Sequence, residues 1–339
     1  MTIFGATLVG PQRHRMPDVL TSPAPQEQPS SASRPLSRVA AADVLTGAYL
    51  AFIGLLATVF AERIPQWWWY PLTHATVIFA CTIFLLKLPP TPTGWVRFVR
   101  WWYPAFLIPP IFTELARLVH PINPVDIDPQ LIALDYVLFG VHPTVWLERW
   151  TVPWLTEYMQ LAYVMFYFLP FVLCAPLYRQ GQMRAFRISL CALLLGYYVS
   201  YVLYFLTPAR GPRFYLAADQ TVPLTGLWLT APLQAILDAL EGVQHDAFPS
   251  GHTAIAIIVL VMAARYQPRL FYPLVVASMS LVVSTVYLRY HYVIDVIAGL
   301  LLAVLCLGVT FWLYREHGEP YTALWLSTHG SKWSSERRA

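Results

Sequence analysis

The sequence predicts an all-α fold, a polytopic transmembrane bundle of about eight helices. The 339-residue chain is 57% hydrophobic and only 12% charged, and its mean hydropathy is +0.52. A soluble domain carries about twice that fraction of charged residues. The apolar residues occur in blocks near the roughly 20 residues that a helix needs to cross a bilayer. Composition and block length together therefore indicate a helical membrane protein.

Three regions follow from composition along the chain. Residues 1–38 are rich in Pro, Ser, Gln and Ala and show no apolar period, so we expect a disordered cytoplasmic tail. This stretch also lacks the charged start, short apolar core and cleavage site of a signal peptide. Residues 39–316 form the predicted transmembrane catalytic domain, and we expect residues 317–339 to form a cytoplasmic C-terminal tail.

Eight apolar blocks define the expected membrane-spanning helices. The third contains two consecutive prolines, Pro109 and Pro110, so we expect a kink there. Trp and Tyr gather at the edges of two blocks, at residues 67–70 and 101–103, as in the aromatic belts of membrane proteins. The expected helices span residues 41–60, 68–86, 101–119, 152–177, 186–206, 250–264, 270–288 and 291–314.

Two connections, residues 121–150 and 207–249, are too long to be simple turns. Within the first, residues 131–140 are amphipathic enough to lie along the membrane surface. We expect the acidic residues of this connection to be solvated, namely Asp126, Asp128 and Asp135. We expect Glu114 and Glu157, which lie within or beside apolar blocks, to have packing partners in the bundle.

The cysteines and most histidines carry no metal-site pattern. All four cysteines fall inside apolar blocks without a CxxC pair or a Cys/His cluster, so we expect neither zinc ligation nor a disulfide framework. Isolated histidines at helix ends usually serve as caps or are solvated, which is our expectation for His74, His120 and His142. His245 and Asp246 either contact a polar headgroup or form an ordinary solvated pair.

The distribution of basic residues predicts the orientation. With eight crossings, sixteen of the 22 Lys and Arg residues fall on the side that holds both termini. The positive-inside rule then places both termini in the cytoplasm. We expect a multi-pass protein of the plasma membrane, of bacterial type, with its site on the extracytoplasmic face.

Two short polar motifs each open a long apolar block: Phe-Pro-Ser-Gly-His-Thr at 248–253 and His-Tyr-Val-Ile-Asp at 291–295. A Ser-Gly-His turn at a helix start offers free N–H groups and the positive end of the helix dipole, which suit a phosphate. His291 and Asp295 are four residues apart, so on a helix the carboxylate can hold the imidazole. The pair of motifs predicts a phosphoryl-transfer site at a membrane surface.

The expected topology brings the two motifs to one side of the membrane. The end of the fifth helix, the start of the sixth and the junction of the seventh and eighth all fall there. Three of the basic residues on this side belong to the predicted site, although each could also be an interfacial anchor. The residues that can converge are Arg210, Arg213, Ser250, Gly251, His252, Arg289, His291 and Asp295.

These motifs resemble those of the type 2 phosphatidic acid phosphatase (PAP2) superfamily. Residues 249–252 resemble its second motif, and residues 291–295 resemble the end of its third, with Ser284 at that motif's opening serine. The resemblance covers about residues 210–299 directly and implies a six-helix catalytic core. The Lys of the family's first motif is absent, and Thr285 stands where the third motif has Arg. This pattern is closer to the branch of inositol phosphorylceramide synthase-like and sphingomyelin synthase-like transferases.

The residues suit chemistry through a phosphohistidine. Phosphoryl transfer needs neutralised non-bridging oxygens, an in-line nucleophile and a protonated leaving oxygen. We assign His291 as nucleophile, Asp295 as the group that fixes its tautomer, and His252 as general acid and then base. The groups assigned to the phosphoryl oxygens are Arg210, Arg213, Arg289, the Ser250 hydroxyl and the Gly251 N–H. We expect no metal and no cofactor, since arginines supply the positive charge.

The leading hypothesis is an integral membrane, metal-independent enzyme that cleaves or transfers the phosphate group of a lipid phosphate. Its partners would be the lipid phosphate and the bilayer, and no nucleic acid. The alternative is a phosphotransferase with an alcohol acceptor such as inositol, which makes a phospholipid or phosphosphingolipid. A lipid transporter would require an internal repeat, which we do not find. Haloperoxidase-like chemistry, which uses a similar pocket in soluble relatives, is disfavoured by the membrane-embedded chain.

Overall fold

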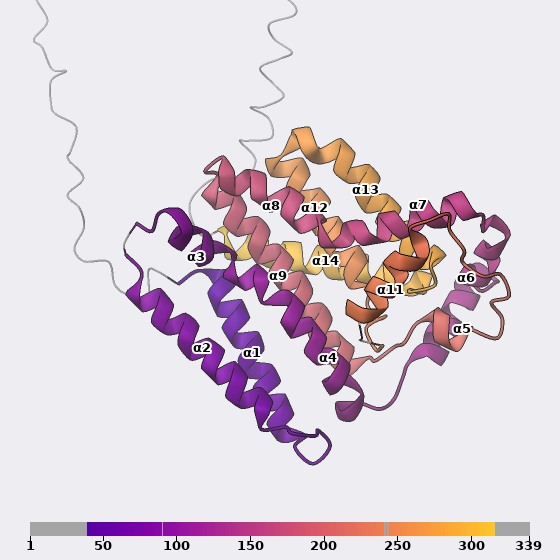
Figure 1. The fold of residues 1–339 in the computed structure, drawn as a ribbon, viewed down its shortest axis with the longest axis horizontal. Helices are drawn as coiled ribbons and strands as arrows, with labels where there is room; N and C mark the ends of the chain where they lie inside the picture. Colours follow the sequence, from indigo (N-terminus) through magenta and orange to yellow (C-terminus); the bar gives the residue numbers. More distant parts are fainter. Residues whose placement is uncertain (1–38, 90, 241, 243, 316–339) are drawn as a thin grey trace, which may run out of the picture. The chain divides into compact units, whose positions relative to one another are not determined.

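The computed structural model describes residues 39–315 except 90, 241 and 243, and all of them belong to one compact unit. Within this part of the chain the regular elements are all helices, so the predicted all-α class is confirmed (Figure 1). Among the described residues, six helices are long and apolar enough to cross a membrane, or up to eight if each of two bent pairs is one span. The predicted tails at 1–38 and 317–339 lie outside the described residues.

Two brief 3₁₀ segments extend the helical stretches in the part of the chain that the structure describes. In chain order the helical elements are α1 (Ala41–Val59), α2 (Trp69–Lys87), α3 (Gly94–Phe106), α4 (Ile108–Ile122), α5 (Asp128–Phe139), α6 (Pro143–Trp146), η2 (Leu147–Trp150), α7 (Pro153–Val164), η3 (Met165–Tyr167), α8 (Leu169–Arg179), α9 (Met183–Leu206), α10 (Pro212–Tyr215), α11 (Thr230–Leu240), α12 (Gly251–Tyr266), α13 (Pro268–Tyr287) and α14 (Val293–Leu313).

α1 and α2 lie side by side (Figure 1). The start of α1 is tied to α3 by a buried ion pair, in which both terminal nitrogens of Arg100 donate to the Asp43 carboxylate at 2.9 and 2.7 Å. The Tyr103 hydroxyl donates to the same carboxylate at 2.6 Å. A buried pair is costly unless further hydrogen bonds satisfy it, and Tyr103 provides one.

The expected kink in the third span is a break between α3 and α4 at Leu107. Proline has no N–H to donate, so Pro109 and Pro110 leave the carbonyls of Ala105 and Phe106 without their usual helical partners. The two helices still form one candidate span, Gly94–Ile122. The prolines therefore break this span, as the sequence predicts. The break lies at Leu107, two residues before Pro109.

The helix expected at residues 152–177 is not continuous, which corrects that prediction. α7 with η3 and then α8 form a pair bent by 43°, with the break at Phe168. Pro170 lies at the start of α8, where its missing N–H costs no helical hydrogen bond. A second pair, α5 with α6 and η2, is bent by 62°.

α12 is largely buried within the bundle. Its 16 residues span about 24 Å at 1.5 Å per residue, less than the hydrocarbon thickness of about 30 Å. It contacts α8, α9, α13 and α14, and its sequence is rich in Ala, Ile and Val, which pack closely on all sides. A short, apolar, enclosed helix therefore carries the Ser-Gly-His motif at its first turn.

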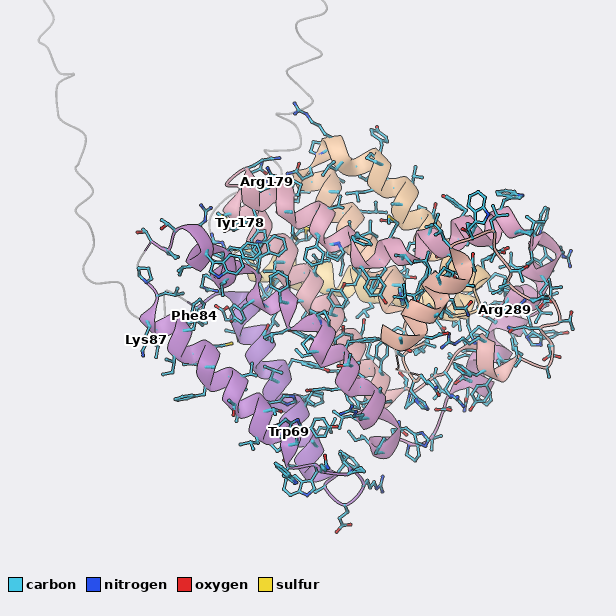
Figure 2. The ribbon with its side chains drawn as sticks, viewed as in Figure 1. Trp69, Phe84, Lys87, Tyr178, Arg179 and Arg289 are labelled. Carbon is cyan, nitrogen blue, oxygen red and sulfur yellow. The ribbon has the colours of Figure 1, made fainter. Side chains whose placement is uncertain are left out.

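The outer faces of the bundle are apolar, and charged groups gather at its ends. On α14, for example, Leu301 and Leu305 are 65% and 59% exposed, as expected for side chains that meet lipid. In Figure 2, Lys87 at the end of α2 and Arg179 at the end of α8 lie toward the upper left of the bundle, whereas Trp69 at the start of α2 and Arg289 between α13 and α14 lie toward the opposite side. The two motifs belong to the end that holds Arg289.

Candidate active site

The two motif histidines meet at the centre of the candidate site. His252 is the second residue of α12, and His291 lies two residues before α14. His252 Nδ1 is 3.1 Å from His291 Nε2, and the ring centroids are 5.3 Å apart at 64°. His291 is 2% exposed. The fold therefore brings together two imidazoles that are 39 residues apart in the sequence.

Ser250 fixes the start of α12 against the start of α14. It is the N-cap residue, and its hydroxyl accepts from the Thr253 N–H at 3.2 Å. Its own N–H donates to the Asp295 carbonyl at 3.0 Å. Gly299 permits this approach, because a Cβ at that position would collide with the Ser250 carbonyl. Ser250 is fully buried, so in this structure its hydroxyl acts as a helix cap.

The tautomer of His291 follows from a backbone carbonyl. His291 Nδ1 is 2.7 Å from the Ala247 carbonyl oxygen and 3.4 Å from Asp295 Oδ2. A carbonyl can only accept, so Nδ1 carries the proton and Nε2 presents its lone pair toward His252. Asp295 Oδ2 accepts from the Tyr292 N–H at 2.8 Å. The sequence analysis assigned the tautomer to Asp295, whereas the closer partner is Ala247.

His291 is held neutral by its surroundings. Burial lowers the pKa of His291 to about 4, and the nearby Asp246 carboxylate and the Ala247 carbonyl oppose this shift only in part. A neutral imidazole at pH 7 keeps the Nε2 lone pair available, as a nucleophile requires. Asp246 is half-buried and lines the same cavity as His252, so it belongs to the site region.

Two buried carboxylates of α5 hold the loops around His291. Asp128 accepts from the Arg210 and Gly211 N–H groups, each at 2.8 Å, and from the Tyr292 hydroxyl at 2.9 Å. Its exposure is 0%, and that of Asp135 is 1%. The expectation that both are solvated is therefore wrong. Both carboxylates are buried and accept hydrogen bonds from backbone N–H groups of other segments.

Asp135 caps α14 from another helix. It accepts from the Val293 N–H at 3.0 Å and from the Ile294 N–H at 2.8 Å. These are first-turn amides, which have no acceptor within their own helix, and the carboxylate also complements the helix dipole. α5 consequently turns its acidic side inward and leaves Val137 and Phe139 exposed. This polarity explains why the sequence pattern indicated a surface segment.

The three predicted phosphate-binding arginines have other partners in this structure. Arg213 forms a 3.3 Å pair with the half-exposed Asp238, and Arg289 pairs with the Glu148 carboxylate at 2.8 Å. Arg210 Nη2 donates to the Gln244 side chain at 3.0 Å. The fold therefore places all three near the motifs, with each guanidinium in an ion pair or hydrogen bond of its own.

Arg213 and Arg289 line a polar cavity of about 220 Å³, together with Gln220, Gln234 and Tyr290. An aromatic stack connects this cavity to the histidine pair. Tyr290 stacks on Tyr163 at 4.4 Å between centroids, and Tyr163 lies 4.8 Å from the His252 ring. The Arg213 guanidinium lies over the Tyr290 ring, 5.0 Å from its centroid.

A larger, apolar cavity of about 310 Å³ begins at His252. Near His252 it is lined by Gly251, Ser200 and Tyr204, and the Tyr204 hydroxyl lies against Gly251. Along α9 its lining runs from Tyr204 to Leu190, a distance of about 21 Å at 1.5 Å per residue. Side chains of α3, α4 and α8 close its other sides, including Trp102, which stacks on Phe171.

Several site features carry no signal in the sequence. The Ala247 carbonyl is a backbone group, so no residue type marks it. Tyr163 and Phe166, whose rings lie 4.8 and 4.2 Å from that of His252, come from α7 and η3 and read as ordinary core residues. Asp128 and Asp135 were visible as acidic residues on an apolar helix, which is a signal for buried carboxylates with partners.

We expect Asp135→Ala to destabilise the junction that carries His291. The change leaves two largely buried N–H groups without an acceptor, at a cost of about 1–3 kcal/mol for a buried donor. Asp135→Asn keeps one acceptor oxygen and should lose less. Thermal unfolding of the purified protein in detergent measures the effect. Asp219→Ala, which removes an exposed carboxylate, is the matched control, and an equal loss in both variants would contradict the role of Asp135.

Comparisons with known proteins agree with this site. The PAP2 superfamily model matches residues 129–309, more than half of the chain and most of the stretch from α5 to α14. A PA-phosphatase related-family protein of Dictyostelium discoideum is 24% identical in an alignment of 172 residues, which covers 45% of this chain and 31% of that protein. The chain thus matches about a third of that relative's length, and no solved structure matches it. The chain belongs to the PAP2 superfamily.

Proposed function

We propose that the protein is a membrane enzyme that cleaves or transfers the phosphate group of a lipid phosphate through a phosphohistidine. The observation that carries this proposal is the 3.1 Å His252–His291 pair at one end of a long apolar cavity. An imidazole pair suits nucleophilic and acid–base steps on a phosphoester. The apolar cavity suits the hydrocarbon part of the same substrate.

In the first step, His291 Nε2 attacks phosphorus and the bond from phosphorus to the leaving oxygen breaks. Protonated His252 gives its proton to that oxygen, which leaves as an alcohol. In the second step, neutral His252 takes a proton from water or from an acceptor alcohol. The new oxygen–phosphorus bond forms as the nitrogen–phosphorus bond breaks, and both histidines return to their starting states.

The positive charge for these steps would come from the arginines. The Arg213–Asp238 pair is partly exposed, and such pairs contribute little to stability, so a phosphate dianion can displace Asp238. Arg289 lines the same polar cavity as Arg213, and its ion pair with Glu148 is less exposed. We assign Arg210, Arg213 and Arg289, with Ser250 and Gly251 at the start of α12, to the phosphoryl oxygens.

The charge distribution supports an extracytoplasmic site. Lys87 and Arg179 lie toward the end of the bundle away from Arg289 (Figure 2), and most basic residues of the sequence belong to the connections on that side. The positive-inside rule places this basic end in the cytoplasm. The histidine pair would then face the opposite side, where lipid substrates enter from the outer leaflet.

An alcohol acceptor is the second candidate, and the polar cavity favours it. Its Arg213, Gln220, Gln234 and Arg289 side chains offer donors and acceptors for a polyol or a phosphorylated polyol. The aromatic stack of Tyr163 and Tyr290 links this cavity to His252. In this arrangement the acceptor approaches the phosphohistidine from the side opposite to the lipid chain. The product would be a phospholipid or phosphosphingolipid.

Trapping the phosphoenzyme tests the catalytic roles. His291→Ala should abolish turnover and labelling by a ³²P-phosphoester.

His252→Asn should slow turnover by about 10²–10⁴-fold, yet accumulate label from an aryl ester, whose leaving group needs no protonation. The second step then lacks its base, so the labelled intermediate persists. Label is measured on protein denatured in detergent at alkaline pH, because the nitrogen–phosphorus bond of a phosphohistidine hydrolyses in acid. His142→Gln, at a histidine outside the pair, is the control. Labelled His291→Ala protein would refute the assignment.

Filling part of the apolar cavity should shorten the preferred substrate. Ala105 lines the cavity one turn from Trp102, so Ala105→Phe removes space for the chain. Each buried CH₂ contributes about 0.8 kcal/mol, so kcat/KM for a long-chain lipid phosphate should fall about tenfold relative to a short-chain one. Ala116→Phe, at an exposed position on α4, is the control. Unchanged chain-length preference in Ala105→Phe would remove the cavity from the proposal.

The acceptor is tested with a lipid phosphate labelled in its phosphate group. Incubation with and without candidate alcohols, inositol among them, should produce labelled lipid only when the correct acceptor is present if the enzyme is a transferase. Chromatography of the lipid and aqueous phases gives the distribution of label. Label that stays in water-soluble products whatever alcohol is added would identify water as the acceptor.

A further inference from the structure

A cluster of two histidines and one aspartate lies outside the catalytic pair. His120 is in the last turn of α4, Asp126 is in the connection that follows, and His245 is in the loop before α12. One potential ligand atom from each residue lies within 4.8 Å of the other two. His245 Nε2 is 3.5 Å from Asp126 Oδ1, and the two imidazoles stack at 5.0 Å between centroids.

The donor set and its spacing suit a zinc-like ion. Zinc binds imidazole nitrogen and carboxylate oxygen at 2.0–2.2 Å in tetrahedral geometry, which places neighbouring ligand atoms about 3.4 Å apart. The His245–Asp126 distance already has this value, and small side-chain rotations would bring His120 into place. Two imidazoles and one carboxylate leave a fourth position for water. Imidazole ligands favour zinc and similar transition metals over magnesium or calcium.

The carboxylate of Asp126 is oriented as a ligand. Asp126 Oδ2 accepts from the Tyr215 hydroxyl at 3.1 Å, a contact of the kind that orients metal-binding carboxylates. Asp126 Oδ1 is buried and accepts no hydrogen bond from the described residues. A buried acceptor without a donor costs free energy, and a bound cation would satisfy it.

Both basic and acidic residues surround His245. Burial lowers the pKa of His245, and neighbouring His120 and Arg210 lower it further, whereas Asp126 and Asp128 oppose this shift. The positive charge of Arg210 disfavours a metal ion nearby. Its guanidinium contacts the Gln244 side chain and the ring of Phe214.

We propose that His120, Asp126 and His245 bind one zinc-like divalent ion that ties α4 to the loop before α12. His245 is two residues before Ala247, whose carbonyl holds Nδ1 of His291. The ion would therefore stabilise the backbone that orients His291 while taking no part in the chemical steps. No local sequence pattern marks this site, because His120 and His245 are far apart in the chain and no cysteine accompanies them.

Direct titration tests the site without reference to catalysis. The full chain is purified in detergent with a tag that contains no histidine, stripped with EDTA, and titrated with ZnCl₂ by calorimetry. We expect one equivalent to bind, with at least tenfold weaker binding in His120→Ala, Asp126→Asn and His245→Ala. Cobalt in place of zinc should give the visible absorption of a tetrahedral site. His142→Gln should bind as the unmodified protein does.

The His120→Ala variant keeps the test interpretable, because this side chain is exposed and its loss should leave metal-free thermal unfolding unchanged. Zinc should raise the unfolding temperature of the unmodified protein and not that of His120→Ala. Equal zinc affinity in the unmodified protein and in the His120→Ala/His245→Ala double variant would overturn the proposal. A comparable loss in His142→Gln would also overturn it, since binding would then be non-specific.

Discussion

Backbone amides at the start of α14 and in the 210–211 turn have no acceptor within their own elements, and α5 supplies the acceptors. Asp128 and Asp135 together accept from four backbone N–H groups and one tyrosine hydroxyl. Buried amides must be paired, so these contacts fix where the chain turns between α13 and α14. His291 lies in that turn, and its position against His252 depends on the turn staying in place.

The histidine pair separates two environments of opposite character. On one side, the apolar cavity follows α9 for about four turns of 5.4 Å each and is closed by aromatic side chains of α3, α4 and α8. On the other side, Arg213 and Arg289 line a polar cavity behind the Tyr163–Tyr290 stack. A substrate with a hydrocarbon chain and a charged head matches this division. The bent α7–α8 pair contributes to both sides, through Tyr163 and through Phe171.

The family match begins within α5, so α1 to α4 lie outside it. These helices nevertheless reach the site. α3 and α4 close the far end of the apolar cavity, and α4 provides His120 of the proposed metal site. The buried Arg100–Asp43 pair ties α3 to α1, so the N-terminal helices form a packed support for that wall. Chain-length preference and metal binding would then be properties that this part of the chain adds to the shared catalytic core.

Local sequence patterns determined a large part of this protein. Apolar blocks of bilayer length predicted the helices, because spanning segments must satisfy every backbone group internally. Consecutive prolines predicted the break between α3 and α4, since proline lacks the N–H that a helix needs. The Ser-Gly-His and His-xxx-Asp motifs indicated the histidine pair because each motif is short and begins a helix. The family resemblance rested on the same residues.

Only the tertiary structure decided how these pieces are held. Asp128 and Asp135 read as solvated residues, yet they are buried because they satisfy amides about 80 to 160 positions away in the chain. The acceptor that sets the His291 tautomer is the Ala247 backbone, which has no signature in residue type. The arginines were expected around one phosphate, whereas each has its own hydrogen-bond or ion-pair partner in the fold. Periodicity and motifs report on neighbours along the helix, and contacts between distant segments depend on packing that no local pattern contains.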